Sequence, residues 1–136
     1  MIDWKRIKHF KEDEWRLDPD KANPLLVKIL DTLRAISGSK IRINGCWAES
    51  GHSKNSWHYT GNAVDFVFLS KIYYLQQYSY LSLFSELRGI GFYPDWDTPG
   101  WHVDLRPEFL RWVRINGNYL YDRNVFIKTI INMDLK

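Results

Sequence analysis

The chain has 136 residues, of which 45% are hydrophobic and 26% charged, a balance that is typical of a folded globular domain and excludes an intrinsically disordered chain. The formal net charge is only +3, and basic residues are mixed with acidic ones, as in residues 5–16, so nucleic-acid binding is not expected. The single cysteine, Cys46, excludes an internal disulfide and a zinc site built from cysteines.

The first half of the chain predicts a helix, a strand, a long loop and a second strand. Residues 23–38 begin with Asn-Pro, which suits a helix cap and a first helical position, continue with apolar residues at helical spacing and end in glycine. Residues 40–44 alternate between polar and apolar side chains, as in a short strand. Residues 45–61 are rich in Gly, Ser and Asn, and long loops inside compact domains are often functional. A β-rich apolar run at 62–69 predicts the second strand.

The second half predicts another helix, several short strands and a C-terminal helix. Residues 70–89 fit a helix that Ser70 caps and Gly89 ends. Further elements are expected as a strand and turn at 91–100, a strand at 101–106, a hairpin at 111–122 and a short helix from Arg123. Because short strands and helices are interspersed, we expect a single α+β domain over residues 1–136, with an antiparallel sheet flanked by helices.

Two histidines and an aspartate stand where a metal site could form. Alternation along the strands places His102 and Asp104 on one face of their strand, and Asp65 on the face opposite its apolar neighbours. His58 lies in the loop just before the strand of Asp65. Two imidazoles and a carboxylate at ~2 Å fill three tetrahedral positions of a zinc ion and leave the fourth for a water that can attack an amide. Spacing alone leaves the alternative open that these are ordinary hydrogen-bonded residues.

A family resemblance adds to this pattern. Residues 56–65, SWHYTGNAVD, resemble the Ser-x-His-x-x-Gly-x-Ala-x-Asp signature of the zinc D-Ala-D-Ala carboxypeptidase family of peptidoglycan peptidases, which shares its fold with the hedgehog signalling domain. Residues 89–94, GIGFYP, and 101–112, WHVDLRPEFLRW, resemble the second half of small phage and periplasmic endopeptidases in that family. The resemblance covers roughly residues 8–112 and implies a hedgehog/DD-peptidase-like fold. Residues 113–136 form an extension that it does not assign.

The resemblance also implies roles for single residues. Carried over position by position, it makes His58, Asp65 and His102 the ligands of Zn²⁺, with a peptidoglycan peptide as the substrate. It further implies that Ser56 supports the site from behind the ligands. Asp104 is expected to orient a ligand or nearby backbone, because carboxylates behind a metal site fix histidine tautomers.

Two catalytic positions of the family are changed in this chain. Many members carry a glutamate three residues before the last histidine ligand, where this chain has Pro99. Others carry a histidine five residues before that ligand, where this chain has Asp97. A carboxylate there could take a proton from the zinc water and pass it to the leaving amine, so Asp97 is the candidate base and Asp95 the reserve. Both also fit a polar turn, PDWDTPG, and this alternative stays open.

The family's Ser-Gly-Tyr-Arg motif, whose arginine binds a substrate carboxylate, is altered too. Trp47 stands in the place of the arginine, and an indole cannot bind a carboxylate in a bidentate fork. Arg42, Lys54 or Arg106 could take over this task. The change favours an endopeptidase that cuts within stems or cross-links over a carboxypeptidase. The spare His52 is expected to be an exposed loop residue near enough to the site to touch substrate.

Two hypotheses follow from the sequence. The first is a zinc metallopeptidase that hydrolyses peptidoglycan in cell-wall lysis or remodelling, as a phage or prophage endolysin does. The second is a zinc-containing cell-wall or protein-binding module that has lost catalysis, which the residues Pro99 and Trp47 favour. No segment has the length of a membrane span, and residues 1–10 lack the apolar stretch of a signal peptide. We therefore expect synthesis in the cytoplasm and action at the cell wall, after phage-mediated release.

Overall fold

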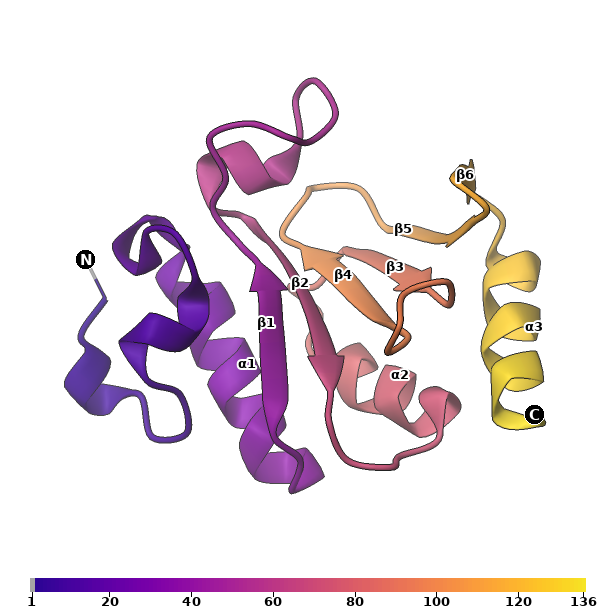
Figure 1. Ribbon diagram of the computed structural model, residues 1–136, viewed down its shortest axis with the longest axis horizontal. Helices are drawn as coiled ribbons and strands as arrows, with labels where there is room; N and C mark the ends of the chain where they lie inside the picture. The colour runs from indigo at the N-terminus through magenta and orange to yellow at the C-terminus, as the bar shows by residue number, and fades with distance from the viewer. Residues whose placement is uncertain (1) are drawn as a thin grey trace.

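A six-stranded sheet runs through the centre of the computed structural model, which describes residues 2–136 (Figure 1). The strands are β1 Ile41–Gly45, β2 Ala63–Phe68, β3 Gly89–Tyr93, β4 Gly100–Asp104, β5 Leu110–Ile115 and β6 Asn118–Leu120. They lie in the order β1-β2-β4-β3-β5-β6, and all neighbours are antiparallel except β3 and β5, which are parallel. The α+β prediction is confirmed, whereas the sheet is mixed and not purely antiparallel.

The parallel pair follows from the position of β4. This strand pairs with β2 on one side and with β3 on the other, so both of its edges are occupied. The chain reverses after β4 and runs along the free edge of β3, which gives β5 the same direction as β3. Strands β5 and β6 then form the predicted hairpin, and its turn residues Asn116 and Gly117 both have positive φ, as a two-residue turn of type I′ requires.

Three α-helices accompany the sheet within residues 2–136, namely α1 Pro24–Ser37, α2 Tyr74–Ser82 and α3 Arg123–Asp134. Helix α1 begins and ends as predicted, because the side chain of Asn23 accepts a hydrogen bond from Leu25 N at 2.9 Å and Gly38 adopts a left-handed conformation after its last turn. In the same described part of the chain, none of the helices combines the length and the apolar character that crossing a bilayer requires.

Helix α2 is shorter than the helix predicted at 70–89, and Ser70 does not cap it. The backbone N–H groups of Tyr74 and of the next residue donate instead to the carboxylate of Asp134, at 2.5 and 2.9 Å. The helix ends well before Gly89, which is the first residue of β3. The cap lies 60 residues along the chain from Tyr74, so no local pattern could reveal it.

The sheet has an apolar face and a polar face. Alternate residues of the three strands β2, β3 and β4 are fully buried on the apolar face, namely Val64, Phe66, Ile90, Phe92, Trp101 and Val103. They share one hydrophobic core with the helices. Trp101, for example, donates its indole N–H to Gln77 of α2 at 2.8 Å, and its ring lies 6.4 Å from that of Phe126 in α3. The opposite face carries Asp65 and His102, as alternation predicts.

Strand β3 presents two glycines to the polar face. A Cβ at Gly89 would lie 2.2 Å from Oδ1 of Asp104, and a Cβ at Gly91 would lie 2.4 Å from the Trp112 ring. Neither position can carry a side chain unless its neighbours move. The strand is therefore bare where Asp104 and Trp112 approach it, and this leaves room for a layer of functional side chains on the polar face.

Candidate metal centre

The loop between β1 and β2 holds His58 in place. The 3-10 turn Trp57–Thr60 begins after Ser56, whose hydroxyl accepts a hydrogen bond from the backbone N–H of His58 at 3.2 Å. The side chain of His58 is only 3% exposed, and its Nδ1 lies 2.7 Å from the carbonyl oxygen of Cys46. Because a carbonyl can only accept, Nδ1 carries a proton and donates it, and Nε2 is the ring nitrogen that faces Asp65. The loop thus fixes both the position and the tautomer of His58.

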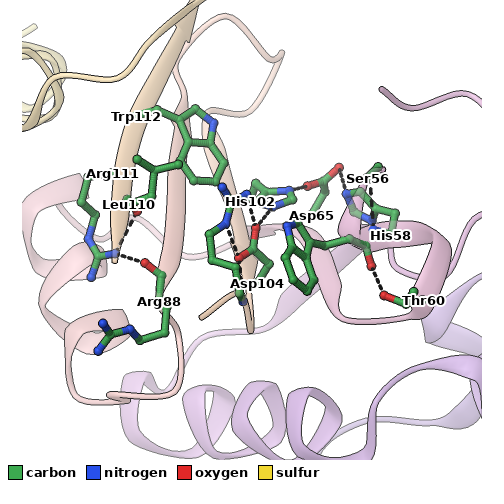
Figure 2. Close-up of polar contacts among 12 residues, drawn as sticks. Ser56, His58, Thr60, Asp65, Arg88, His102, Asp104, Leu110, Arg111 and Trp112 are labelled. Carbon is green, nitrogen blue, oxygen red and sulfur yellow. Dashed lines mark hydrogen bonds and ion pairs between the residues drawn. The ribbon is translucent and has the colours of Figure 1, made fainter. Parts of the chain in front are cut away.

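Asp65 and His102 face each other across β2 and β4, where they are direct partners in the strand register. Oδ1 of Asp65 lies 2.9 Å from Nδ1 of His102, and Oδ2 lies 3.3 Å from Nε2 of His58. One ligand atom from each of the three residues lies within 4.8 Å of the other two. Figure 2 shows the carboxylate of Asp65 between the two imidazoles. The three predicted ligands therefore come together.

Asp104 orients His102 from the side away from this cluster. Its Oδ2 lies 2.7 Å from Nε2 of His102, and its side chain is fully buried. Arg106 donates from Nε and Nη2 to the two oxygens of Asp104, at 2.8 and 2.7 Å. Since a carboxylate accepts, Nε2 of His102 carries a proton, and Nδ1 is the atom that faces Asp65. The predicted role of Asp104 agrees with this arrangement.

The hydrogen bonds of the cluster set its charges. Burial by itself raises the pKa of Asp65, but hydrogen bonds from His102 and His58 outweigh it and hold that pKa well below its usual range. Burial lowers the pKa of His102, yet the hydrogen bonds with Asp104 and Asp65 prevail and raise it to about 9. Without a metal, His102 therefore keeps a second proton at neutral pH. A bound cation would replace that proton, because only a deprotonated ring nitrogen can be a ligand.

The three donors are suited to a divalent metal ion. Two imidazole nitrogens and one carboxylate oxygen form a set that transition metals bind in proteins. Three protein ligands leave at least one coordination position open, which is the pattern of a reactive site and not of a closed structural one. His58, Asp65 and His102 all line a cavity of about 730 Å³, so the open position is accessible to a ligand.

The walls of this cavity come from the β1–β2 loop, the β3–β4 turn and the β5–β6 hairpin. Tyr93 and Trp96 form a stacked pair on one side, with ring centres 4.7 Å apart. Tyr119 and Tyr121 form a second stacked pair, with ring centres 6.2 Å apart. Asp65 is the only carboxylate among the described residues that line the cavity. Aromatic walls of this kind suit an organic chain such as a peptide or a sugar.

Asp97, the candidate base, and Asp95, its reserve, do not line the cavity. They are exposed on the β3–β4 turn, and Asp97 borders a separate hollow with Arg42 and Asn44. Oδ2 of Asp95 accepts a hydrogen bond from Asn116 N at 2.6 Å, which ties this turn to the β5–β6 hairpin. The geometry gives the role of base no support at either position. Both residues lie in the polar turn between β3 and β4, as the alternative reading of the sequence predicts.

Of the three residues considered for carboxylate binding, Arg106 alone lines the cavity. Arg42 borders the separate hollow, and Lys54 is exposed outside the cavity lining. Trp47 is not a lining residue either, and Nζ of Lys21 lies 4.0 Å from its ring centre. Arg106 is already paired with the buried carboxylate of Asp104. None of the three residues therefore offers the cavity an unpaired positive charge that could bind a substrate carboxylate.

Sequence reasoning missed the hairpin side of the cavity. Trp112 lies at the end of the region of resemblance, and Arg114, Tyr119 and Tyr121 belong to the extension at 113–136. The alternation of side chains within β5 was a signal that could have placed Trp112 and Arg114 on one face of the sheet. His52 is exposed, as expected, and stacks on His58 with ring centres 4.1 Å apart. Comparison with protein-family models, curated proteins and solved structures finds no match to this chain.

Proposed function

We propose that this chain is a zinc-dependent metallopeptidase with a hedgehog/DD-peptidase-like fold, and that it hydrolyses amide bonds in bacterial peptidoglycan peptides. The observation that carries the proposal is the convergence of His58, Asp65 and His102 on one point of a cavity. The signature in residues 56–65 resembles that of zinc peptidases with this substrate, and it contains two of the three ligands. Cleavage within the peptide, in cell-wall lysis or remodelling, is favoured because Trp47 replaces the arginine that the motif provides for a terminal carboxylate.

Zinc is the metal that the donor set fits best. Two histidines and one carboxylate, with a free fourth position, are a common ligand set of catalytic zinc. When bound, zinc would supply Lewis acidity and a water whose pKa is lowered to about 7. The only cysteine, Cys46, is buried and contributes its backbone carbonyl to His58 and no thiolate to the cluster.

The chain's own residues hold and orient the groups around the metal position. The carbonyl of Cys46 and the carboxylate of Asp104 orient the two imidazoles so that Nε2 of His58 and Nδ1 of His102 face Asp65, where a metal would bind them in place of their protons. The guanidinium of Arg106 is fixed by Asp104 and lines the cavity. Such preorganised groups need little rearrangement when a substrate binds. The aromatic walls would pack against the peptide and exclude water.

A second candidate function is a zinc-containing module that binds the cell wall or a protein without cleaving it. It is favoured by the absence of any cavity-lining carboxylate besides Asp65 among residues 2–136, because a metal ligand is not free to act as a general base. Asp95 and Asp97 lie outside the cavity. His52 is a further imidazole in the cavity lining, so the cavity still contains a side chain of the type that moves protons.

The experiment that tests the proposal combines metal analysis with digestion of purified peptidoglycan. The native protein is compared with His58→Ala and with His9→Ala, a control that removes an exposed histidine outside the site. We expect about one zinc per chain in the native protein and in the control. We also expect both to release fragments with new peptide ends, detected by mass spectrometry. The His58→Ala variant and chelator-treated native protein should release none.

The outcomes separate the two functions. Bound zinc without any new peptide ends would exclude the peptidase and leave the binding module, whose retention on sedimented cell walls can then be measured. A native protein that neither contains nor takes up a divalent metal would exclude both. The positions of the new ends would also identify the bond that is cut.

A further inference from the structure

The β5–β6 hairpin forms one wall of the cavity beside the metal centre. Alternation along β5 puts Trp112 and Arg114 on the polar face, whereas Val113 between them is fully buried on the other face. The Trp112 ring lies 5.2 Å from that of His102, so the wall begins next to a predicted ligand. Arg114 pairs with Tyr119 across the hairpin, and both residues line the cavity.

Arg114 carries a charge that the surrounding side chains do not balance. Among residues 2–136, no acidic side chain forms an ion pair with it, and its guanidinium lies 5.4 Å from the ring centre of Tyr119. A cation over an aromatic face is held in place without losing its charge. Arg106, by contrast, is paired with Asp104 through two hydrogen bonds. Arg114 is therefore the arginine in this cavity with free donors for a ligand.

The charge of the whole cavity favours an anion. Its lining contains two arginines and one carboxylate, and the buried Asp104 balances Arg106 from below. A divalent metal would more than neutralise Asp65. The net charge of the cavity would then be positive, and Arg114 is an exposed residue that contributes to it. In a partly enclosed site such a charge attracts a negative group more strongly than it does in open water.

Contacts with neighbouring segments fix the β5–β6 hairpin at the edge of the cavity. Asp95 accepts a hydrogen bond from Asn116 N in the hairpin turn at 2.6 Å. The ring of Tyr121 lies 6.1 Å from that of Trp112 and 6.2 Å from that of Tyr119. Tyr119 and Tyr121 are 43% and 61% exposed, so these rings offer apolar area that a bound chain would cover.

We propose that Arg114, supported by Tyr119, forms a subsite for a carboxylate of the peptide substrate close to the amide that is cut. The inference rests on the proposed function, because it is the peptide nature of the substrate that makes the anion a carboxylate. A guanidinium binds a carboxylate through two parallel hydrogen bonds and thus reads its planar shape as well as its charge. Arg114 determines specificity in this scheme and takes no part in the chemical step.

The test uses two forms of one ligand, the peptidoglycan stem tetrapeptide with free carboxylates and the same peptide with all of them converted to carboxamides. Native protein is compared with Arg114→Gln, with Arg114→Lys, and with Arg42→Gln, a control at an arginine outside the cavity. Binding is followed by tryptophan fluorescence, since Trp96 and Trp112 line the cavity. Cleavage of both peptides is measured in parallel.

We expect the native protein and Arg42→Gln to bind the carboxylate form about 10- to 100-fold more tightly than the carboxamide form. Arg114→Gln should bind both forms as weakly as native protein binds the carboxamide, and Arg114→Lys should keep part of the preference. In cleavage, KM should rise in Arg114→Gln while kcat changes less than about twofold, because the lost contact is present before and during the reaction.

Equal binding of the two peptides by native protein, or a preference that persists in Arg114→Gln, would overturn the inference even if the wall is digested. A preference that depends on Arg114 without any cleavage would uphold the inference and refute the peptidase. Failure of native protein to bind either peptide would overturn the inference whatever the digestion shows.

Discussion

The two faces of the sheet are built from the same strands but bury different kinds of side chain. In β4, Trp101 and Val103 point into the core that the helices cover, whereas His102 and Asp104 point to the candidate metal centre. The core face is apolar and is covered by helices. The other face is covered by a loop and a hairpin and contains buried polar groups, each with hydrogen-bond partners.

The two faces show how a small domain can hold a polar cluster rigidly. Residues on a strand cannot move independently of their neighbours, so the packing of Trp101 and Val103 also fixes His102. Strand β3 is divided in the same way, because the large residue Ile90 faces the core and Gly91 faces the site. Stability should therefore depend on the core face and metal binding on the site face, and each expectation can be tested by itself.

The largest effect is expected from Phe92→Ala on the core face. Phe92 is fully buried between the Trp101 and Tyr74 rings, at 4.8 and 5.4 Å between ring centres. Its removal should lower the free energy of unfolding by about 3–5 kcal/mol through lost burial and a cavity. Urea unfolding with a chelator present measures this without a contribution from metal binding. Metal content per folded chain should stay unchanged, and a loss of metal below the unfolding transition would contradict the division between the faces.

The next effect compares two buried aspartates, Asp104 in β4 and Asp31 in α1. Asp104→Asn should weaken metal binding about 10- to 100-fold, because His102 loses the carboxylate that orients it. Asp31 of α1 accepts hydrogen bonds from Lys8 N at 3.1 Å and from His9 N at 2.6 Å. It has no contact with the three candidate ligands and therefore serves as the control. Asp31→Asn should cost about 1 kcal/mol of stability and leave metal affinity unchanged. Calorimetry of metal binding and thermal unfolding measure the two quantities, and equal metal affinities in both variants would contradict the comparison.

The parts of this arrangement that the sequence predicted are those with local signals. Asn23 and Gly38 mark the ends of α1, and the period of two in β4 separates His102 from Trp101. The three candidate ligands could be predicted because strand alternation and the motif in residues 56–65 indicate the same residues. These features depend on neighbouring residues only, so one sequence is enough to reveal them.

The parts that were missed depend on residues far apart in the chain. The start of α2 is set by Asp134, and the direction of β5 by the occupied edges of β4. The direction of the Asp97 side chain is likewise set by the β3–β4 turn, which places it at a separate hollow, and its predicted role as base stays a prediction. Arg114 lay beyond the region of resemblance, and only the pairing of β5 with β3 brings it to the cavity.

Metal affinity should depend on pH through the site face alone. In the metal-free protein the pKa of His102 is raised to about 9, so below that pH a metal must displace a proton from Nδ1. The metal affinity should therefore fall about tenfold when the pH drops from 8 to 7, and it should stop rising above about pH 9. Asp104→Asn removes one of the two carboxylates that raise this pKa and should move the levelling to lower pH. Calorimetry in buffers of different ionisation enthalpy counts the proton released, and an affinity independent of pH would rule this coupling out.

The smallest effects are expected at the β3–β4 turn, where Asp95 and Asp97 form a matched pair. Asp95→Ala removes the bond to Asn116 N and loosens the hairpin, so the carboxylate tetrapeptide should bind about two- to fivefold more weakly, since one such hydrogen bond contributes about 0.5–1.5 kcal/mol. Asp97→Ala should change binding and wall digestion by less than about twofold, because this carboxylate lies outside the cavity lining. A general base contributes about 10²- to 10⁴-fold to a rate. A loss of that size in Asp97→Ala, with metal content and fold intact, would show that the turn closes over the cavity during catalysis and that the motif located the base correctly.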